Sequence, residues 1–396
     1  MENDFIKPRY DQGGFAGLPK RIGDWLTGPD KYDAVVLFLI DGFGWRFVEK
    51  YQEIPFLKQV ARQGQVEKLT SQFPSTTASH LTTLHTGMPV GEHGIFEWIY
   101  YEPAIGKVIA PLLFSFSGTS ERDTLKSAGV KPRNLYPGKT LYGALKKQGI
   151  SATILQSREY TPSTYSNAMF RGALVRSYRD LPEGLVSLSQ MLEKTNPQAY
   201  YVLYYDKIDG VCHDYGPGSP QTEAEIKVFL MMMEQIFQKQ MSLNGRKILC
   251  LLTADHGQVE TDPQTSVYLN REPRFAGILK YLKTDQEDKP IVPAGSARDF
   301  FLYIQEEMVD EAQNFLSDRL EGQAEVWKVA DLISEGYFGP TISTKLRGRA
   351  GDLVILPYQD EAVWWYEKDK FEQRFRGHHG GLTPPEMEIP LLSWEL

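Results

Sequence analysis

The stretch AVVLFLIDG, residues 34–42, decides the fold. Its first seven residues, Ala34 to Ile40, are all apolar and rich in branched side chains, which is typical of a strand buried on both faces of a parallel sheet. Two later stretches have the same form, AYYVLYYD at 199–206 and KILCLLTADHG at 247–257. In each of the three, an apolar run ends close to an acidic residue.

Helical patterns lie between the predicted strands. TLYGALKKQG (140–149) ends in a glycine that suits a helix C-terminus, and the strand-like SATILQS (151–157) follows it. From Glu223 to Met241 apolar residues recur at every third or fourth position, which indicates an amphipathic helix. This alternation predicts an α/β fold, a doubly wound and mostly parallel sheet flanked by helices, which binds ligands beyond the carboxyl ends of its strands.

The chain is expected to divide into a core and an inserted subdomain. Between Thr261 and Gln373 no histidine occurs, and short strand-like and helical segments follow one another, as in a small α+β cap. The stretch DLVILP (352–357) would then return the chain toward the core. We therefore expect an N-terminal extension at 1–30, a catalytic core at 31–265 and 371–396 with a loop-rich insertion at about 100–133, and an inserted α+β cap subdomain at 266–370.

Composition excludes several classes of protein. The 396 residues carry a net charge of -8 without a long basic run, which argues against duplex nucleic acid or an anionic membrane as partner. Two cysteines give no disulfide framework, and no apolar run approaches the ~18 residues of a membrane span. The N-terminus lacks a leader pattern, so we expect a soluble, cytoplasmic protein. Its oligomeric state is left open.

The seven histidines of the chain are confined to a few short segments that are also rich in aspartate. Asp209 and His213 are spaced i, i+4, and Asp255 and His256 are adjacent at a predicted strand exit. Each feature alone has a simpler reading, a turn after Asp41 or a surface pair at Asp209 and His213. Together they indicate a metal site. The segments are 73–95, 204–217, 251–258 and 376–386, and Asp41 in 37–45 joins them.

The segment FPSTTASH (73–80) supplies a nucleophile. The hydroxyls of Thr76 and Thr77 are weak nucleophiles at neutral pH unless they are activated. A simpler reading is that Ser75 or Thr76 caps a following helix. Both readings are compatible, because a helix N-terminus also presents free amide groups to a phosphate.

Taken in order, the motifs LIDGFG, FPSTTASHLTTLHTG, DGVCHDYG, TADHG and GHHGG resemble those of the alkaline phosphatase superfamily, and most closely its nucleotide pyrophosphatase/phosphodiesterase branch. They span roughly residues 35 to 390. The resemblance implies that Thr77 is the nucleophile. It also implies two sets of metal ligands, one made of Asp41, Thr77, Asp255 and His256 and the other of Asp209, His213 and His379.

Two divalent cations would be balanced by the three aspartates and a Thr77 alkoxide, so the loaded site can accept an anionic phosphoryl group. Mixed aspartate and histidine ligands suit zinc best, with manganese or iron as alternatives. In such a pair one ion activates the attacking oxygen and the other stabilises the leaving oxygen. We expect a covalent phosphothreonine intermediate at Thr77.

Departures from the family pattern bear on the substrate. His80 replaces an asparagine that contacts a phosphate oxygen in nucleotide-cleaving relatives, and we expect it to bind that oxygen instead. Ala78 replaces an aromatic residue that stacks on a base. The arginine that phosphomonoesterases keep beside their nucleophile is absent, which favours diesters or pyrophosphates as small phosphorylated substrates. A phosphomonoesterase of the same superfamily, or a non-catalytic binding protein with this fold, is the alternative.

Overall fold

The computed structural model describes residues 5–194, 198–239 and 245–396, and its centre is a seven-stranded sheet. Strand β18 is antiparallel to both of its neighbours, while the other adjacent strands run parallel. The predicted α/β class with a mostly parallel sheet is therefore confirmed. In spatial order the strands are β2 (Gln65–Thr70), β18 (Glu388–Glu395), β9 (Ile248–Thr253), β1 (Ala34–Ile40), β8 (Ala199–Tyr205), β6 (Ser151–Ser157) and β7 (Leu174–Tyr178).

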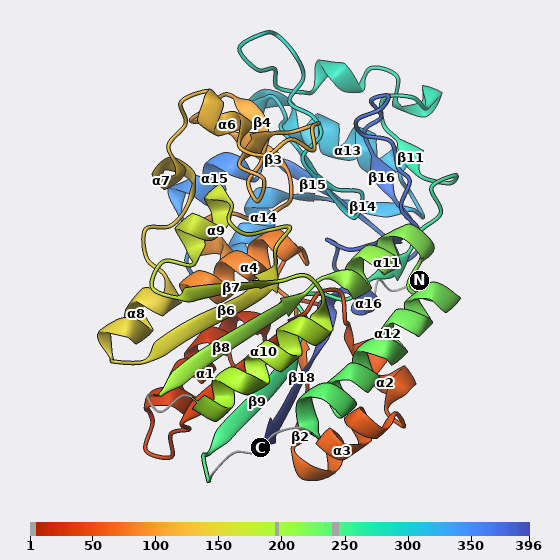
Figure 1. Ribbon diagram of the computed structural model, residues 1–396. Coiled ribbons are helices and arrows are strands. Elements are labelled where there is room, and N and C mark those ends of the chain that lie inside the picture. Colours follow the sequence, from red (N-terminus) through yellow and green to blue (C-terminus); the bar gives the residue numbers. More distant parts are fainter. Residues whose placement is uncertain (1–4, 195–197, 240–244) are drawn as a thin grey trace.

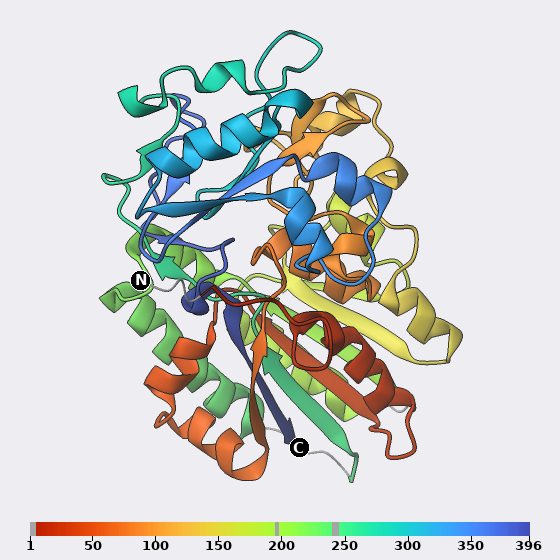
Figure 2. The ribbon, with the colours of Figure 1, turned by 180° about the vertical axis from the view of Figure 1, so that it is seen from behind.

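Helices cover both faces of this sheet (Figures 1 and 2). One face carries α10 (Leu181–Lys194) and α12 (Pro220–Met232), and the other carries α1 (Leu18–Thr27) and α8 (Leu141–Lys147). A π-helical turn at Met233–Gln238 continues α12, and residues 240 and 241 of the predicted long helix lie outside the described residues. Layers on both faces explain why β1, β8 and β9 are buried along their whole length.

Helix α1, which lies within the expected N-terminal extension, belongs to one of these layers. Leu18, Ile22 and Leu26 of α1 repeat every four residues and are fully buried. That spacing puts them on one face of the helix, which packs against β1. The segment expected to be an extension therefore contributes to the main core.

A second, four-stranded antiparallel sheet lies above the carboxyl ends of the central strands in Figure 1. Its order is β12 (Gly295–Ser296), β13 (Asp299–Leu302), β15 (Leu353–Pro357) and β14 (Ala324–Lys328), and α13 (Val309–Arg319) packs on it. The stretch 352–357, expected to return the chain toward the core, does not join the central sheet but forms β15 of this second sheet, although Val354 and Leu356 share the main apolar cluster. Strand β15 is apolar and buried at every position, and between β13 and β14 both of its edges are paired.

The stretch expected to be a loop-rich insertion contains regular structure. It forms a small antiparallel sheet of β3 (Tyr100–Glu102), β4 (Lys107–Ala110) and β5 (Ser115–Phe116), followed by the short helix α6 (Thr124–Ser127). Ile99 and Ala110 share an apolar cluster with residues of the second sheet. The two peripheral regions therefore pack together above the central sheet. In the described part of the chain, no helix has the length and apolar character needed to cross a bilayer.

Candidate metal centre

Three adjacent parallel strands bring the predicted acidic residues together. Asp41 follows β1, Asp255 follows β9, and Asp209 lies on α11 (Lys207–Tyr215), which starts directly after β8. Strand β1 pairs with β8 on one side and with β9 on the other. Because the carboxyl ends of parallel strands share one edge, these three carboxylates meet there.

Thr77 is the first residue of α4 (Thr77–Thr86), and its Oγ1 lies 3.1 Å from His256 Nε2. Thr76 occupies the N-cap position without a side-chain capping bond, and the Ser75 hydroxyl donates to the carbonyl of Gly381. Thr76 is therefore the N-cap residue, as the simpler reading allowed, although its side chain makes no capping bond. The hydroxyl of Ser75 instead holds the loop that carries the last two histidines.

The first predicted set of ligands surrounds one imidazole nitrogen. His256 Nε2 lies 3.4 Å from Asp41 Oδ1 and 3.4 Å from Asp255 Oδ2. All three side chains are buried. Burial, followed by repulsion from Asp255 and Asp209, raises the pKa of Asp41 well above its usual value. The site therefore concentrates negative charge that a cation would relieve.

The second predicted set gathers around Asp209. His213, one helical turn along α11, places Nε2 at 3.3 Å from Asp209 Oδ2, and His379 Nε2 lies 3.9 Å from Asp209 Oδ1. His379 arrives through β17 (Gly377–His378), which pairs with β10 (Val259–Glu260) just after His256. His378 is turned to the Oε1 of Gln373, 2.9 Å from its Nε2.

The hydrogen bonds of the three predicted histidine ligands show how well the site suits a metal ion. Each ring has its Nδ1 within 3.0 Å of a backbone carbonyl, which can only accept, so each Nδ1 carries the proton. The other ring nitrogen, Nε2, consequently faces a carboxylate oxygen in each of the three residues. Asp41 Oδ1 and Asp255 Oδ2 are buried, and no donor among the described residues forms a hydrogen bond with either oxygen. Opposed acceptors of this kind fit a bound cation, and Asp41, Asp255 and His256 form a candidate metal site.

Two side chains that sequence reasoning missed orient the acidic residues. The Tyr204 hydroxyl donates to Asp41 Oδ2, and the side-chain amide of Gln258 donates to Asp209 Oδ1. Donors of this type fix the direction in which a carboxylate presents its other oxygen. Gln258 closes the TADHGQ segment and could have been suspected. Tyr204 lies inside an apolar strand, where sequence gives no such signal.

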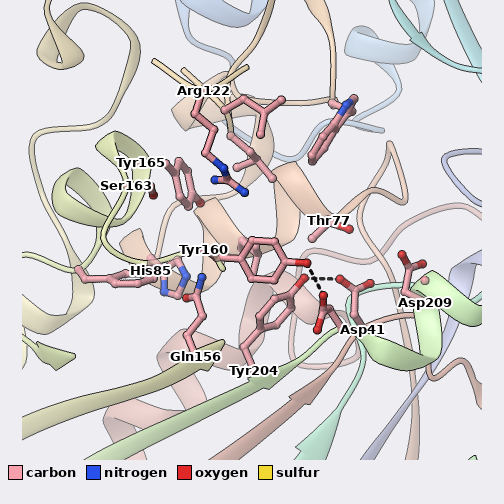
Figure 3. A pocket seen from close by; sticks show the side chains of 17 residues that line it. Asp41, Thr77, His85, Arg122, Gln156, Tyr160, Ser163, Tyr165, Tyr204 and Asp209 are labelled. Atoms are coloured by element: carbon pink, nitrogen blue, oxygen red, sulfur yellow. Dashed lines mark hydrogen bonds between the residues drawn. The ribbon is translucent and has the colours of Figure 1, made fainter. Parts of the chain in front are cut away.

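A pocket of about 230 Å³ opens beside Asp41, Thr77 and Asp209 (Figure 3). Five aromatic side chains contribute to its walls, and Arg122, Gln156 and Ser163 add polar groups; the aromatic residues are Trp98, Tyr160, Tyr165, Phe170 and Tyr204. Tyr160 donates its hydroxyl to Asp206, which also lines the pocket. The aromatic surface that Ala78 cannot provide is therefore present on other elements.

His80 does not line this pocket. Its ring is fully buried, with Nε2 accepting from the Gln72 amide at 2.8 Å and Nδ1 at 2.7 Å from the Thr76 carbonyl. Burial lowers the pKa of His80 to about 3, so the ring is neutral. Both nitrogens are already engaged by the protein, and this placement does not match the predicted contact with a phosphate oxygen. His80 instead joins the strand that leads into the Thr77 loop to the first turn of α4.

Comparison with known proteins relates this geometry to a family. The sequence model described as type I phosphodiesterase/nucleotide pyrophosphatase matches residues 35–382. Human ectonucleotide pyrophosphatase/phosphodiesterase family member 1 is 23% identical over 260 residues, which are 63% of this chain and 26% of that protein. The matched region thus spans about a quarter of the length of this curated relative.

Solved structures share the fold. Murine ectonucleotide pyrophosphatase/phosphodiesterase 5, solved alone and as an inactive variant in complex with AMP, superposes with a TM-score of 0.63 and 17% identity over 90% of this chain and 87% of that chain. Phosphonoacetate hydrolase from Sinorhizobium meliloti 1021, in complex with phosphonoformate, gives a TM-score of 0.60 and 17% identity over 90% of this chain and 89% of that chain. At these identities the likeness concerns the fold.

Proposed function

The chain belongs to the type I phosphodiesterase/nucleotide pyrophosphatase family, and from this premise we propose that it is a metal-dependent phosphoric ester hydrolase that cleaves phosphodiester or pyrophosphate bonds. The observation that carries the proposal is the position of Thr77, whose hydroxyl meets His256 at the edge of a buried cluster of carboxylates and imidazoles. The substrates would be small phosphorylated compounds. The AMP and phosphonoformate complexes of the two structural neighbours agree with that size and chemistry.

Thr77 is the proposed nucleophile. Its hydroxyl stands at the first position of a ten-residue helix, where unpaired backbone amides and the positive end of the helix dipole favour an anionic phosphoryl group. Attack by Oγ1 forms a phosphothreonine while the bond from phosphorus to the leaving oxygen breaks. The Thr77 hydroxyl loses one proton in this step, and the departing alcohol gains one. Water then cleaves the phosphothreonine and restores Thr77.

Two divalent ions, most suitably zinc, are proposed as cofactors, with manganese or iron as alternatives. When bound they would stabilise negative charge on the entering and leaving oxygens. Asp41, Thr77, Asp255 and His256 would hold one ion, and Asp209, His213 and His379 the other. Tyr204 and Gln258 keep Asp41 and Asp209 directed into the site by donating to one oxygen of each.

Diesters are the proposed preference because no arginine stands beside Thr77 in the sequence to meet the second charge of a monoester. A phosphomonoesterase is the second candidate, since Arg122 lines the same pocket and brings a cation from elsewhere in the chain. We would compare kcat/KM for an aryl phosphodiester and its matched monoester at one zinc or manganese concentration. A monoester preference of tenfold or more, about 1.4 kcal/mol, would favour the second candidate.

The role of Thr77 is tested with the same diester. Thr77→Ala should lower turnover by about a hundredfold or more, because the covalent route is lost. Thr76→Ala is the matched control and should cost far less, since Thr76 does not line the pocket. Acid quenching during turnover, followed by peptide mapping, should find phosphate on Thr77. Equal and severe losses in both variants, without a phosphothreonine, would contradict the assignment.

A further inference from the structure

Arg122 brings a permanent positive charge to the pocket beside Thr77. It comes from the region of β3 to α6 and is the single lysine or arginine among the described residues that line the pocket. Figure 3 shows its side chain directed into the pocket, on a different side from Asp41 and Asp209. The residue is exposed, so its guanidinium group is accessible to a ligand that enters.

The guanidinium group is oriented by an aromatic ring and not by an acid. Its central carbon lies 5.7 Å from the centre of the Tyr160 ring, within reach of a cation–π contact. Asp206 accepts a hydrogen bond from the hydroxyl of that ring. Within the described residues, no carboxylate forms an ion pair with Arg122. The planar fork of donors is therefore available for an anion from outside the chain.

The rest of the pocket constrains what accompanies that anion. Leu112, Leu113, Tyr165 and Phe170 give it apolar walls, and Trp98 is 44% exposed at its edge. A volume of about 230 Å³ lies below the ~300–1,000 Å³ common for drug-sized ligands. The pocket therefore suits a compact substituent that is apolar close to phosphorus and charged at its far end.

We infer that Arg122 selects substrates that carry, besides the scissile phosphoryl group, a second anionic group on the substituent that lies in the pocket. That group is a carboxylate or a phosphate, since both match the guanidinium fork. The inference rests on the proposed function, because it presupposes cleavage at Thr77. Arg122 is a specificity residue in this scheme. A neutral substituent of the same size makes no ion pair with the guanidinium group, which then stays hydrated.

The test uses 4-nitrophenyl phosphodiesters whose second substituent is ethyl, 2-carboxyethyl or 2-phosphonooxyethyl. A second series consists of two ethyl diesters, one with a carboxylate on the nitrophenyl leaving group and one without it. This series is needed because either the leaving group or the other substituent on phosphorus could occupy the pocket. Values of kcat/KM are measured for the wild type, Arg122→Gln and the control Arg133→Gln. Arg133 is an exposed arginine of the neighbouring helix α7 (Pro132–Leu135) and does not line the pocket.

Arg122→Gln should lower kcat/KM tenfold or more for the charged substrates of at least one series, and less than twofold for the neutral ethyl diester. Arg133→Gln should change neither. Comparison of kcat/KM for the 2-carboxyethyl and 2-phosphonooxyethyl diesters identifies the preferred anion. Equal effects of Arg122→Gln on charged and neutral substrates would overturn the inference and leave the proposed function standing. Absence of Thr77-dependent hydrolysis of every diester by the wild type would instead remove the proposed function.

Discussion

The imidazole rings of His256 and His379 stack almost in parallel, with centroids 3.6 Å apart and planes 12° from each other. This contact joins the two predicted sets of metal ligands, since His256 lies against Asp41 and Asp255 while His379 faces Asp209. Burial, followed by repulsion from His256, lowers the pKa of His379 well below its usual value. A neutral ring is the form that binds a metal.

Metal stoichiometry should separate the two neighbouring histidines of the GHHGG segment. His379→Ala removes an imidazole directed at Asp209, so the variant should retain about one divalent ion fewer per chain than the wild type. His378→Ala is the matched control, because the Nε2 of His378 is bonded to Gln373. Zinc content is measured by elemental analysis after dialysis. Equal contents in the two variants, or a loss with His378→Ala alone, would contradict the assignment.

Tyr204→Phe should weaken metal binding without unfolding the protein. The variant loses the hydroxyl that donates to Asp41 Oδ2, and loss of such an outer partner costs about 10- to 100-fold in metal affinity. Tyr200→Phe is the control, because Tyr200 lies on the same strand and its buried hydroxyl forms no hydrogen bond within the part of the chain that the structure describes. Competition with a chromogenic chelator gives both affinities. The prediction fails if the two substitutions weaken binding equally.

The dependence of stability on pH should report a buried acid behind the nucleophile loop. Burial raises the pKa of Glu97 from 4.5 to about 8, although hydrogen bonds from the Trp98 amide and the Thr76 side chain act in the opposite direction. Between these pH values the unfolded chain has lost this proton while the folded chain keeps it. The free energy of unfolding should therefore fall as pH rises through this range.

Glu97→Gln removes the titrating group. Relative to the wild type, its free energy of unfolding should increase between pH 5 and pH 8 by an amount on the order of a few kcal/mol, at about 1.4 kcal/mol per pKa unit. Urea denaturation at several pH values, with the metal concentration fixed, measures the difference. Glu92→Gln alters an exposed acid nearby and serves as control. A difference that is constant with pH would show that Glu97 ionises normally.

The central sheet and the ends of its strands could be predicted because fully buried parallel strands are continuous apolar runs. Strands β1, β8 and β9 follow this rule, and acidic residues at or just beyond their exits are visible in the sequence. The same rule misled the interpretation of residues 352–357. An apolar run shows that a strand is buried but does not show which sheet contains it.

Contacts between distant segments account for what the sequence could not show. His80 lies in a segment rich in hydroxyl groups, but its burial depends on Phe15. The centroids of the Phe15 ring and the imidazole lie 4.8 Å apart. Arg122 reaches the pocket only because the small β3–β5 sheet packs above the central strands. Neither relationship leaves a periodic trace in the sequence.

The ion pair between Arg298 and Glu386 should be a major contributor to stability. It joins the turn between β12 and β13 to α16 (Pro384–Met387) through two bonds, from Nε to Oε1 at 3.0 Å and from Nη2 to Oε2 at 2.9 Å, and both side chains are fully buried. Arg298→Met leaves Glu386 buried without its counter-charge. Removal of one partner from a buried pair costs about 3–5 kcal/mol.

The matched control is Arg374→Met, which breaks a pair with Glu372 whose arginine side chain is 69% exposed and should change stability by less than about 1 kcal/mol. Urea unfolding of both variants gives the two free energies. Adding Glu386→Gln to Arg298→Met should restore part of the loss, because it removes the unpaired charge and keeps an oxygen that can accept from the amide of Gly381. If Arg298→Met cost no more than Arg374→Met, the pair would not stabilise the junction between the two sheets, and the packing of the surrounding apolar residues would have to hold it.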